Sequence, residues 1–210
     1  MASAGSSRPV RVLESRAKEF APAWADVCQR RSAGSEDVEK AARKIIERVR
    51  VGGNSELLAC IKQFDGAQIE AVEVSPAEWE EACEAVDPAV RAVMGTAVSR
   101  VRAFHRKRIP SSWEMREAGG AYMGQRLRPL QRVGLYVPGG KALYPSSVIM
   151  TATPASIVEV PEIVMATPPA PDGSICPEVL LAARLAGVHR VFKMGGAHAI
   201  AALAFGTQSV

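Results

Sequence analysis

The residues that could do chemistry lie where apolar segments end in the second half of the chain. Tyr136 lies near the end of one such segment, Val133–Val137, and the glycine turn Gly139–Gly140 follows it. His198 comes just after a second glycine pair, Gly195–Gly196. Glycine turns allow a ligand or another backbone to come close, and free N–H groups at the start of a following helix favour an anion. These turns indicate a site for a nucleotide or another anion, although simple turning between strand and helix explains the same glycines.

Each polar side chain near these turns has a structural explanation beside the functional one. Tyr136 could stack on a ligand or hydrogen-bond it, or it could be a core aromatic with its hydroxyl at the edge. His198, in the first turn of the last predicted helix, could donate to a ligand, or it could be solvated or cap the helix. His105 is expected near the carbonyl groups at the end of a long helix, and His189 is expected at the surface.

The usual fingerprint of a dinucleotide site is absent from this sequence. No G-x-G-x-x-G follows a predicted strand, and the second strand ends in Thr167-Pro168-Pro169 rather than in an acidic residue that could hold a ribose. We find no nucleophile–base pair and no pair of carboxylates at a useful spacing, so no catalytic residue is assigned. The residues alone support a nucleotide-binding α/β unit but not a conventional NAD site.

Cysteine and histidine spacing predicts no self-contained metal site. The cysteines are Cys28, Cys60, Cys83 and Cys176, and no two of them form a C-x-x-C motif. No two of the three histidines stand at the helical spacing of zinc ligands. We therefore expect reduced thiols, no zinc ligands in this chain and a cytoplasmic location.

Strands and helices alternate from Val133 onwards, which predicts a parallel sheet. Strands are expected at 133–137, 162–166 and 190–194, each followed by a helix. Ser146 or Ser147 is expected to cap the first of these helices, and Pro177 opens the second. The order β-α-β-α-β-α is typical of an α/β fold with a Rossmann-like parallel sheet.

The residues before Val133 predict many helices and little sheet. Helices are expected at about 17–29, 35–51, 54–65, 76–86 and 88–108, a short strand at 71–74, and a hairpin at 113–130. Gly52–Gly53 should end one helix, Asn54 should cap the next, and Ser75 with Glu78 should form a capping box. Gly119–Gly120 should form the turn of the hairpin.

These elements predict three regions. We expect an N-terminal helical arm over 1–34, the first part of a helix-rich α/β domain over 35–132, and an incomplete Rossmann-like domain over 133–210. A sheet of three strands with an open edge suggests that the remaining strands follow in a longer protein.

Composition limits the partners. The 210 residues are 48% apolar and 23% charged, with a net charge of +4. Acidic and basic residues are mixed, and the densest basic cluster lies at a predicted helix end, so no nucleic-acid partner is expected. No apolar run reaches the ~20 residues that span a bilayer, so no membrane partner is expected.

Two long motifs frame the second half of the chain. The first is V-G-L-Y-V-P-G-G-K-A-x-Y-P-S-S-V-x-M, from Val133 to Met150, and the second is G-G-A-x-A-I-A-A-L-A-F-G-T, from Gly195 to Thr207. Both closely resemble motifs of the histidinol dehydrogenase family. The likeness extends upstream through the Phe64-Asp65-Gly66 turn and covers nearly all of the chain beyond about residue 35.

The resemblance implies a cytoplasmic, zinc-dependent homodimer that oxidises L-histidinol through L-histidinaldehyde to L-histidine with two NAD⁺. It implies that Tyr136 contacts NAD, and that His198 does so at a position where the family usually has glutamine. An imidazole lacks the paired donor and acceptor of an amide, so this contact differs from that of the family. The family's zinc ligands and catalytic Glu-His pair lie beyond residue 210, so we expect the chain alone to be an inactive fragment.

Two other interpretations stay open. A paralogue in the same fold could oxidise another small polar alcohol, such as a sulfonated diol, and His198 is compatible with that difference. Alternatively, the chain could be a truncated, non-catalytic protein that keeps only a nucleotide-binding fold.

Overall fold

The computed structural model describes residues 12–29, 35–139 and 143–210. Gly140 of the first predicted glycine turn lies outside these residues, as do residues 1–11 and 30–34 of the predicted arm. The chain divides into two compact units, Met1–Arg43 and Lys44–Val210. The boundaries predicted at residues 34 and 132 stay predictions.

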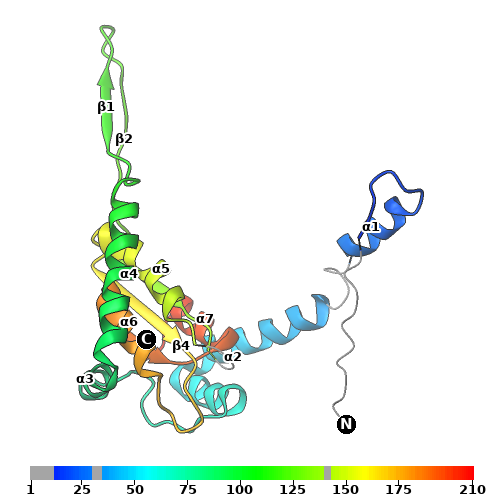
Figure 1. The fold of residues 1–210 in the computed structure, drawn as a ribbon, viewed down its shortest axis with the longest axis vertical. Helices are drawn as coiled ribbons and strands as arrows, with labels where there is room; N and C mark the ends of the chain where they lie inside the picture. Colours follow the sequence, from blue (N-terminus) through cyan, green and yellow to red (C-terminus); the bar gives the residue numbers. More distant parts are fainter. Residues whose placement is uncertain (1–11, 30–34, 140–142) are drawn as a thin grey trace. The chain divides into compact units, whose positions relative to one another are not determined.

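Helices and strands are both present, which confirms the α/β class (Figure 1). The helices are α1 (Phe20–Gln29), α2 (Ser35–Cys60), the π-helical turn η1 (Ile61–Asp65), α3 (Pro76–Ala85), α4 (Pro88–Arg106), α5 (Pro145–Ile157), α6 (Pro177–Ala186) and α7 (Gly196–Phe205). The strands are β1 (Trp113–Arg116), β2 (Tyr122–Gln125), β3 (Arg132–Tyr136), β4 (Glu162–Thr167) and β5 (Arg190–Lys193). Among the helices of the described residues, none is both long and apolar enough to cross a membrane.

In the first unit, α1 begins later than the predicted start at residue 17. Its aromatic pair Phe20 and Trp24 is stacked, with ring centroids 6.0 Å apart. Ala23 is the buried residue of this helix.

The second unit contains a parallel sheet with the strand order β3-β4-β5. Leu135 lies opposite Met165, and Met165 lies opposite Val191. The three strands that the sequence predicts are therefore confirmed, within one or two residues at their ends.

Alternate side chains of β4 enter two separate cores, because successive residues of a strand point to opposite faces. Ile163 and Met165 pack with apolar residues of α3, α4, α5 and α6. Val164 and Ala166 pack with apolar residues of α2, η1 and α7. The sheet is thus covered on both faces, as a parallel sheet requires.

The strand predicted at residues 71–74 is reduced to a single antiparallel bridge between Glu73 and Phe192. Two backbone hydrogen bonds support it, from the N–H of Val74 to the carbonyl of Val191 (2.9 Å) and from the N–H of Lys193 to the carbonyl of Val72 (2.7 Å). This segment covers the outer edge of β5 and satisfies N–H and C=O groups that would otherwise be open.

Of the predicted helix caps, Ser75 is confirmed and Asn54 is wrong. The hydroxyl oxygen of Ser75 accepts from the N–H of Glu78 (3.2 Å). Oδ1 of Asn54 instead accepts from the N–H of Ser209 (3.2 Å), so it does not cap the helical turn that follows it. The Glu78 carboxylate does not complete a capping box, because it pairs with Lys193 at 2.7 Å. Gly53 breaks α2 with φ 56° and ψ −139°, as the glycine pair predicted.

The expected start of α5 was wrong. The helix begins at Pro145, and Tyr144 occupies the N-cap position without a side-chain hydrogen bond. Ser146 and Ser147 therefore lie in the first turn instead of capping it. The reason is that proline has a helical φ in advance and needs no N–H partner at the first helical position, so the helix starts two residues earlier than a Ser146 cap would place it.

The predicted hairpin is confirmed. Strand β1 pairs with β2 in antiparallel register, from Trp113 opposite Gln125 to Arg116 opposite Tyr122. Gly120 has φ 88° in the turn between them, a conformation that glycine adopts without strain. All residues of both strands are exposed.

Candidate functional site

The candidate site lies at the carboxyl edge of the parallel sheet. Strand β3 ends at Tyr136, and β5 is followed by the turn Gly195–Gly196 and helix α7. Because parallel strands end at the same edge, these two segments meet there. The N–H of Gly196 donates to the hydroxyl oxygen of Tyr136 at 3.1 Å, so the predicted site residue holds the predicted glycine turn.

A third segment, far away in the sequence, enters the same place. Asp65 is the last residue of η1, and Gly66 ends that helix in the left-handed conformation with φ 74°. The Asp65 oxygen Oδ2 accepts from the N–H of Gly195 at 3.0 Å and lies 2.9 Å from Nε2 of His198. One carboxylate oxygen therefore ties the glycine turn and the first turn of α7 to the end of η1.

His198 is buried, which excludes the solvated role that the sequence left open. Its side chain is 1% exposed and that of Asp65 is 8% exposed. The Phe64 ring stacks on the imidazole, with centroids 5.9 Å apart and the planes inclined by 25°. The histidine is thus held by a charge-assisted hydrogen bond at one ring nitrogen and by an aromatic ring on one face.

The glycines of both turns are needed for close packing. A Cβ on Gly195 would lie 2.6 Å from Oδ1 of Asp65 and 2.7 Å from Cβ of Pro168. A Cβ on Gly139 would lie 2.7 Å from Cγ of the same proline. The strand–helix packing explanation of these glycines therefore applies, and Pro168 is the surface that both turns contact.

The electrostatics of the α7 N-terminus follow from this arrangement. Unsatisfied N–H groups and the helix macrodipole make a helix start attractive to an anion. Here Asp65 supplies the anion, and it takes the N–H of Gly195. The first turn of α7 is therefore served by a carboxylate of the protein, whereas the hydroxyl of Tyr136 and the second ring nitrogen of His198 have capacity left for a ligand.

The other two histidines do not join this site. His105 packs edge-on against the neighbouring Phe104 ring, with centroids 5.3 Å apart. His189 is exposed as predicted, and its Nδ1 accepts from the N–H of Ile163 at 2.9 Å. Both make local structural contacts.

The cysteines give no metal centre. Cys60 and Cys83 are buried, and burial raises the pKa of each thiol. Burial is also the main cause of the raised pKa of Cys176, whose thiol donates a hydrogen bond to the Glu178 carboxylate. Across residues 12–29, 35–139 and 143–210, no group of three or more His, Cys, Asp and Glu side chains is placed to hold a metal ion.

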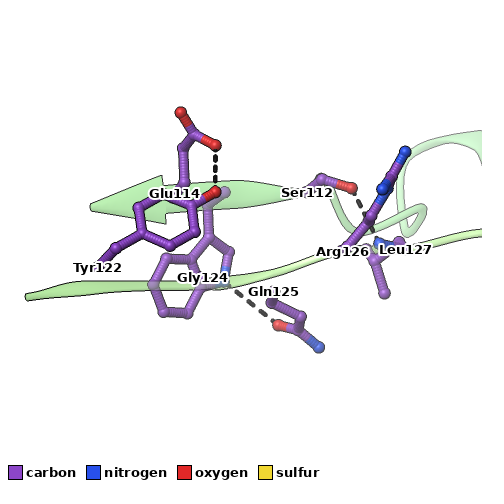
Figure 2. A pocket seen from close by; sticks show the side chains of 8 residues that line it. Ser112, Glu114, Tyr122, Gly124, Gln125, Arg126 and Leu127 are labelled. Atoms are coloured by element: carbon purple, nitrogen blue, oxygen red, sulfur yellow. Dashed lines mark hydrogen bonds between the residues drawn. The ribbon is translucent and has the colours of Figure 1, made fainter. Parts of the chain in front are cut away.

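The hairpin carries an open hollow of about 670 Å³ that we do not assign as the site (Figure 2). Its polar side chains satisfy one another: the Tyr122 hydroxyl donates to Glu114 at 2.6 Å, and the Trp113 indole N–H donates to Gln125 at 3.2 Å. None of the residues that line it belongs to the carboxyl edge of the parallel sheet. Its chemistry is that of a solvated hairpin surface.

Asp65 is the residue of this site that the sequence did not identify. It lies 133 positions before His198, and no spacing rule connects a carboxylate at a helix end with a histidine so far away. The one signal was the Phe64-Asp65-Gly66 turn, which the family likeness includes without assigning it a role.

Comparison with known proteins gives a consistent result. The histidinol dehydrogenase family profile matches residues 28–210. A histidinol dehydrogenase of Symbiobacterium thermophilum is 46% identical over 184 residues, which are 87% of this chain and 42% of the relative. One of Syntrophotalea carbinolica is 43% identical over 203 residues, which are 96% of this chain and 47% of the relative.

A solved structure supports the same likeness. The crystal structure of histidinol dehydrogenase from Elizabethkingia anophelis superimposes with a TM-score of 0.79 at 29% identity, and the match covers 83% of this chain and 40% of that one. The chain thus spans less than half the length of the relatives it matches.

Proposed function

Because the chain belongs to the histidinol dehydrogenase family, we propose that it supplies the dinucleotide-binding part of an enzyme that oxidises L-histidinol to L-histidine through L-histidinaldehyde. The observation that carries the proposal is the match over residues 28–210, which includes both motifs of the carboxyl edge. The activity itself is proposed for a protein of the full length of the relatives, of which the match covers less than half.

The carboxyl edge suits the polar groups of NAD. When bound, NAD⁺ supplies the hydride acceptor of the reaction. Tyr136 uses its hydroxyl oxygen to accept from Gly196, so its hydroxyl proton is available to orient a ribose or phosphate oxygen. His198 has its Nε2 committed to Asp65, and its Nδ1 is available to a second partner. These two residues are the proposed cofactor contacts.

Zinc does not fit the residues of this chain that the structure describes, since they form no group of three or more metal-binding side chains. The family's requirement for zinc leads us to propose that the zinc ligands and the residues that move protons belong to the part of the relatives beyond residue 210.

Other properties are proposed on the family likeness. The longer protein would be a cytoplasmic homodimer with the small molecule L-histidinol as its substrate and with no nucleic-acid or membrane partner. The mixed charge of the chain, +4 over 210 residues, supports the absence of a nucleic-acid partner.

A second candidate function rests on His198. The family usually has glutamine there, and a buried imidazole bound to Asp65 offers a ligand one group in place of an amide's two. A paralogue that oxidises another small polar alcohol with NAD would be consistent with this change.

The proposal can be tested with a chimera. Residues 28–210 are joined to the part of the Symbiobacterium thermophilum relative that the match does not cover. We expect zinc binding and NADH formation from L-histidinol, and we expect neither from the 210-residue chain alone. Tyr136→Ala in the chimera should raise the KM for NAD⁺ about tenfold, the effect of one lost hydrogen bond with its packing. NADH formation by the chain alone would contradict the proposal, and so would a folded, zinc-loaded chimera that is active only on other alcohols.

A further inference from the structure

The imidazole of His198 has one nitrogen with a partner and one without. Nε2 lies 2.9 Å from Oδ2 of Asp65, and the Phe64 ring covers one face. Among the described residues, Nδ1 forms no hydrogen bond. The side chain as a whole is 1% exposed, but among the described residues the fully buried polar atom without a partner is Oγ1 of Thr153 and not Nδ1 of His198, so this nitrogen keeps some access from outside.

The free nitrogen lies at the glycine turn. A Cβ built on Gly196 would be 3.6 Å from both Nδ1 and Cε1 of His198, so this edge of the ring lies over the bare Cα of the turn. Gly196 has φ 54° and donates its N–H to Tyr136. Nδ1 therefore lies beside the proposed cofactor contact and not in an apolar interior.

The charge of Asp65 decides what Nδ1 can do. A carboxylate only accepts hydrogen bonds, so the Nε2 that faces it carries a proton. In the neutral ring the other nitrogen then has a lone pair and accepts. Oδ2 of Asp65 also accepts from the N–H of Gly195, which fixes the carboxylate relative to the turn.

We propose that Asp65 is a positioning residue that holds His198 as the Nε2–H tautomer, so that Nδ1 is presented to the bound dinucleotide as a hydrogen-bond acceptor. The ligand group it takes is a donor, a ribose hydroxyl or an amide N–H. The inference rests on the proposed function and narrows it, because the glutamine usual in the family can offer a donor or an acceptor at this position and His198 offers only an acceptor.

The cover over His198 is thin enough for a ligand to reach it. Phe64, which stacks on the ring, is itself 49% exposed. Asp65, the other contact of the ring, is 8% exposed. We therefore expect that Phe64, and not the Asp65–His198 pair, moves where a ligand needs more room.

The tautomer can be observed directly in the 210-residue chain labelled with ¹⁵N-histidine. Long-range ¹H–¹⁵N spectra distinguish Nδ1–H, Nε2–H and doubly protonated rings, and only three histidines require assignment. We expect His198 as Nε2–H at neutral pH, with its Nδ1 signal shifting when NAD⁺ is added. Asp65→Asn should populate both tautomers and weaken NAD⁺ binding about tenfold.

The matched control is Asp172→Asn. Asp172 also accepts two hydrogen bonds, from the N–H and the hydroxyl of Ser174 at 2.9 and 2.7 Å, but it is exposed and lies outside the site. It should leave the His198 signals and NAD⁺ binding unchanged.

The outcomes distinguish a failure of the tautomer inference from a failure of the proposed function. A wild-type ring that is Nδ1–H or doubly protonated would overturn the inference, as would an Asp65→Asn variant with an unchanged tautomer, even if NAD⁺ still binds. An Nε2–H ring that NAD⁺ leaves unchanged, with no binding elsewhere, would instead contradict the proposed function and the ligand assigned to Nδ1.

Discussion

The parallel sheet and the hairpin follow from similar local signals but differ in burial, most of all at the central strand β4. In β4, every residue from Ile163 to Thr167 is buried, whereas every residue of β1 and β2 is exposed. Apolar or β-prone residues next to glycine turns predict both. The difference shows that local signals determine the conformation of a segment, while burial depends on whether distant parts of the chain pack on it.

The hydrogen bonds of the two regions differ in the same way. Side-chain bonds on the hairpin join residues 8, 12 and 15 positions apart. At the carboxyl edge of the sheet, the bonds between Gly196 and Tyr136, Gly195 and Asp65, and His198 and Asp65 span 60, 130 and 133 positions. The carboxyl edge is therefore held by contacts between distant segments, and it is there, not on the hairpin, that we propose the cofactor site.

The largest effect on stability should come from a substitution that leaves a cavity in the core against the sheet. Phe192 in β5 is 0% exposed, and Phe192→Ala should lower the free energy of unfolding by about 3–5 kcal/mol. Urea denaturation followed by circular dichroism measures it. Trp113→Ala on the hairpin, where the side chain is 51% exposed, should change it by less than about 0.5 kcal/mol. Equal losses of unfolding free energy in both variants would contradict the difference in burial between the two regions.

A smaller effect should follow when one buried hydrogen bond is removed. The Trp79 indole N–H donates to the carbonyl of Leu180 at 2.9 Å in a buried position. Trp79→Phe leaves that carbonyl without its donor and should cost about 1–3 kcal/mol in urea denaturation.

The hairpin provides the matched control for this change. The Trp113 indole N–H donates to Gln125 at 3.2 Å in an exposed position, where water can replace it. Trp113→Phe should therefore have no measurable effect. A loss at Trp113 as large as that at Trp79 would contradict the account.

Lowering the pH should reduce the stability of the second unit, because it protonates the carboxylate of Glu162. The hydrogen bond from Arg132, with a further contribution from Arg190, holds the pKa of the Glu162 carboxyl below its ordinary 4.5. A lowered pKa in the folded state contributes stability that is present above pH 4.5 and is lost as the pH falls through the folded value. Glu162→Gln should therefore be less stable than wild type at pH 7 and approach it in acid, as urea midpoints over a pH series would show. A constant difference at every pH would contradict this cause.

The smallest effect is expected on the hairpin at alkaline pH. The hydrogen bond to Glu114 raises the pKa of Tyr122 above its ordinary 10.0. Glu114→Gln should return the pKa of Tyr122 towards that value in a ¹³C-tyrosine NMR titration without moving the urea midpoint at pH 7. A large shift of the midpoint would show that the hairpin contributes to the stability of the unit.

Much of the fold could be predicted because its signals are local. The strands of the parallel sheet, the hairpin turn at Gly120, and the helix ends at Gly66 and Gly187 follow from short patterns of apolar residues and glycine. The start of α5 was missed because Pro145 competes with the serines that follow it. The strand predicted at 71–74 pairs with β5 through a single bridge, and a local pattern cannot indicate how far a segment pairs with a partner more than 100 positions away.

The site could be predicted only in part for the same reason. Tyr136 was chosen as a candidate because it lies at a strand end, and His198 because it follows a glycine turn; their contact with a cofactor stays a prediction. The burial of His198 and its partner Asp65 were not predicted, since they result from packing η1 against α7 across more than 130 positions. Single-sequence patterns contain no information on such pairs.

The most direct test of the account is to map NAD⁺ binding on the 210-residue chain. Backbone amide signals are recorded while NAD⁺ is added. We predict shifts at Gly195 and Gly196, which bond to Asp65 and Tyr136, and none at Gly124 in the hairpin hollow. Shifts confined to the hairpin, or none in the glycine turn at saturating NAD⁺, would contradict the claim that the carboxyl edge of the parallel sheet is the cofactor site.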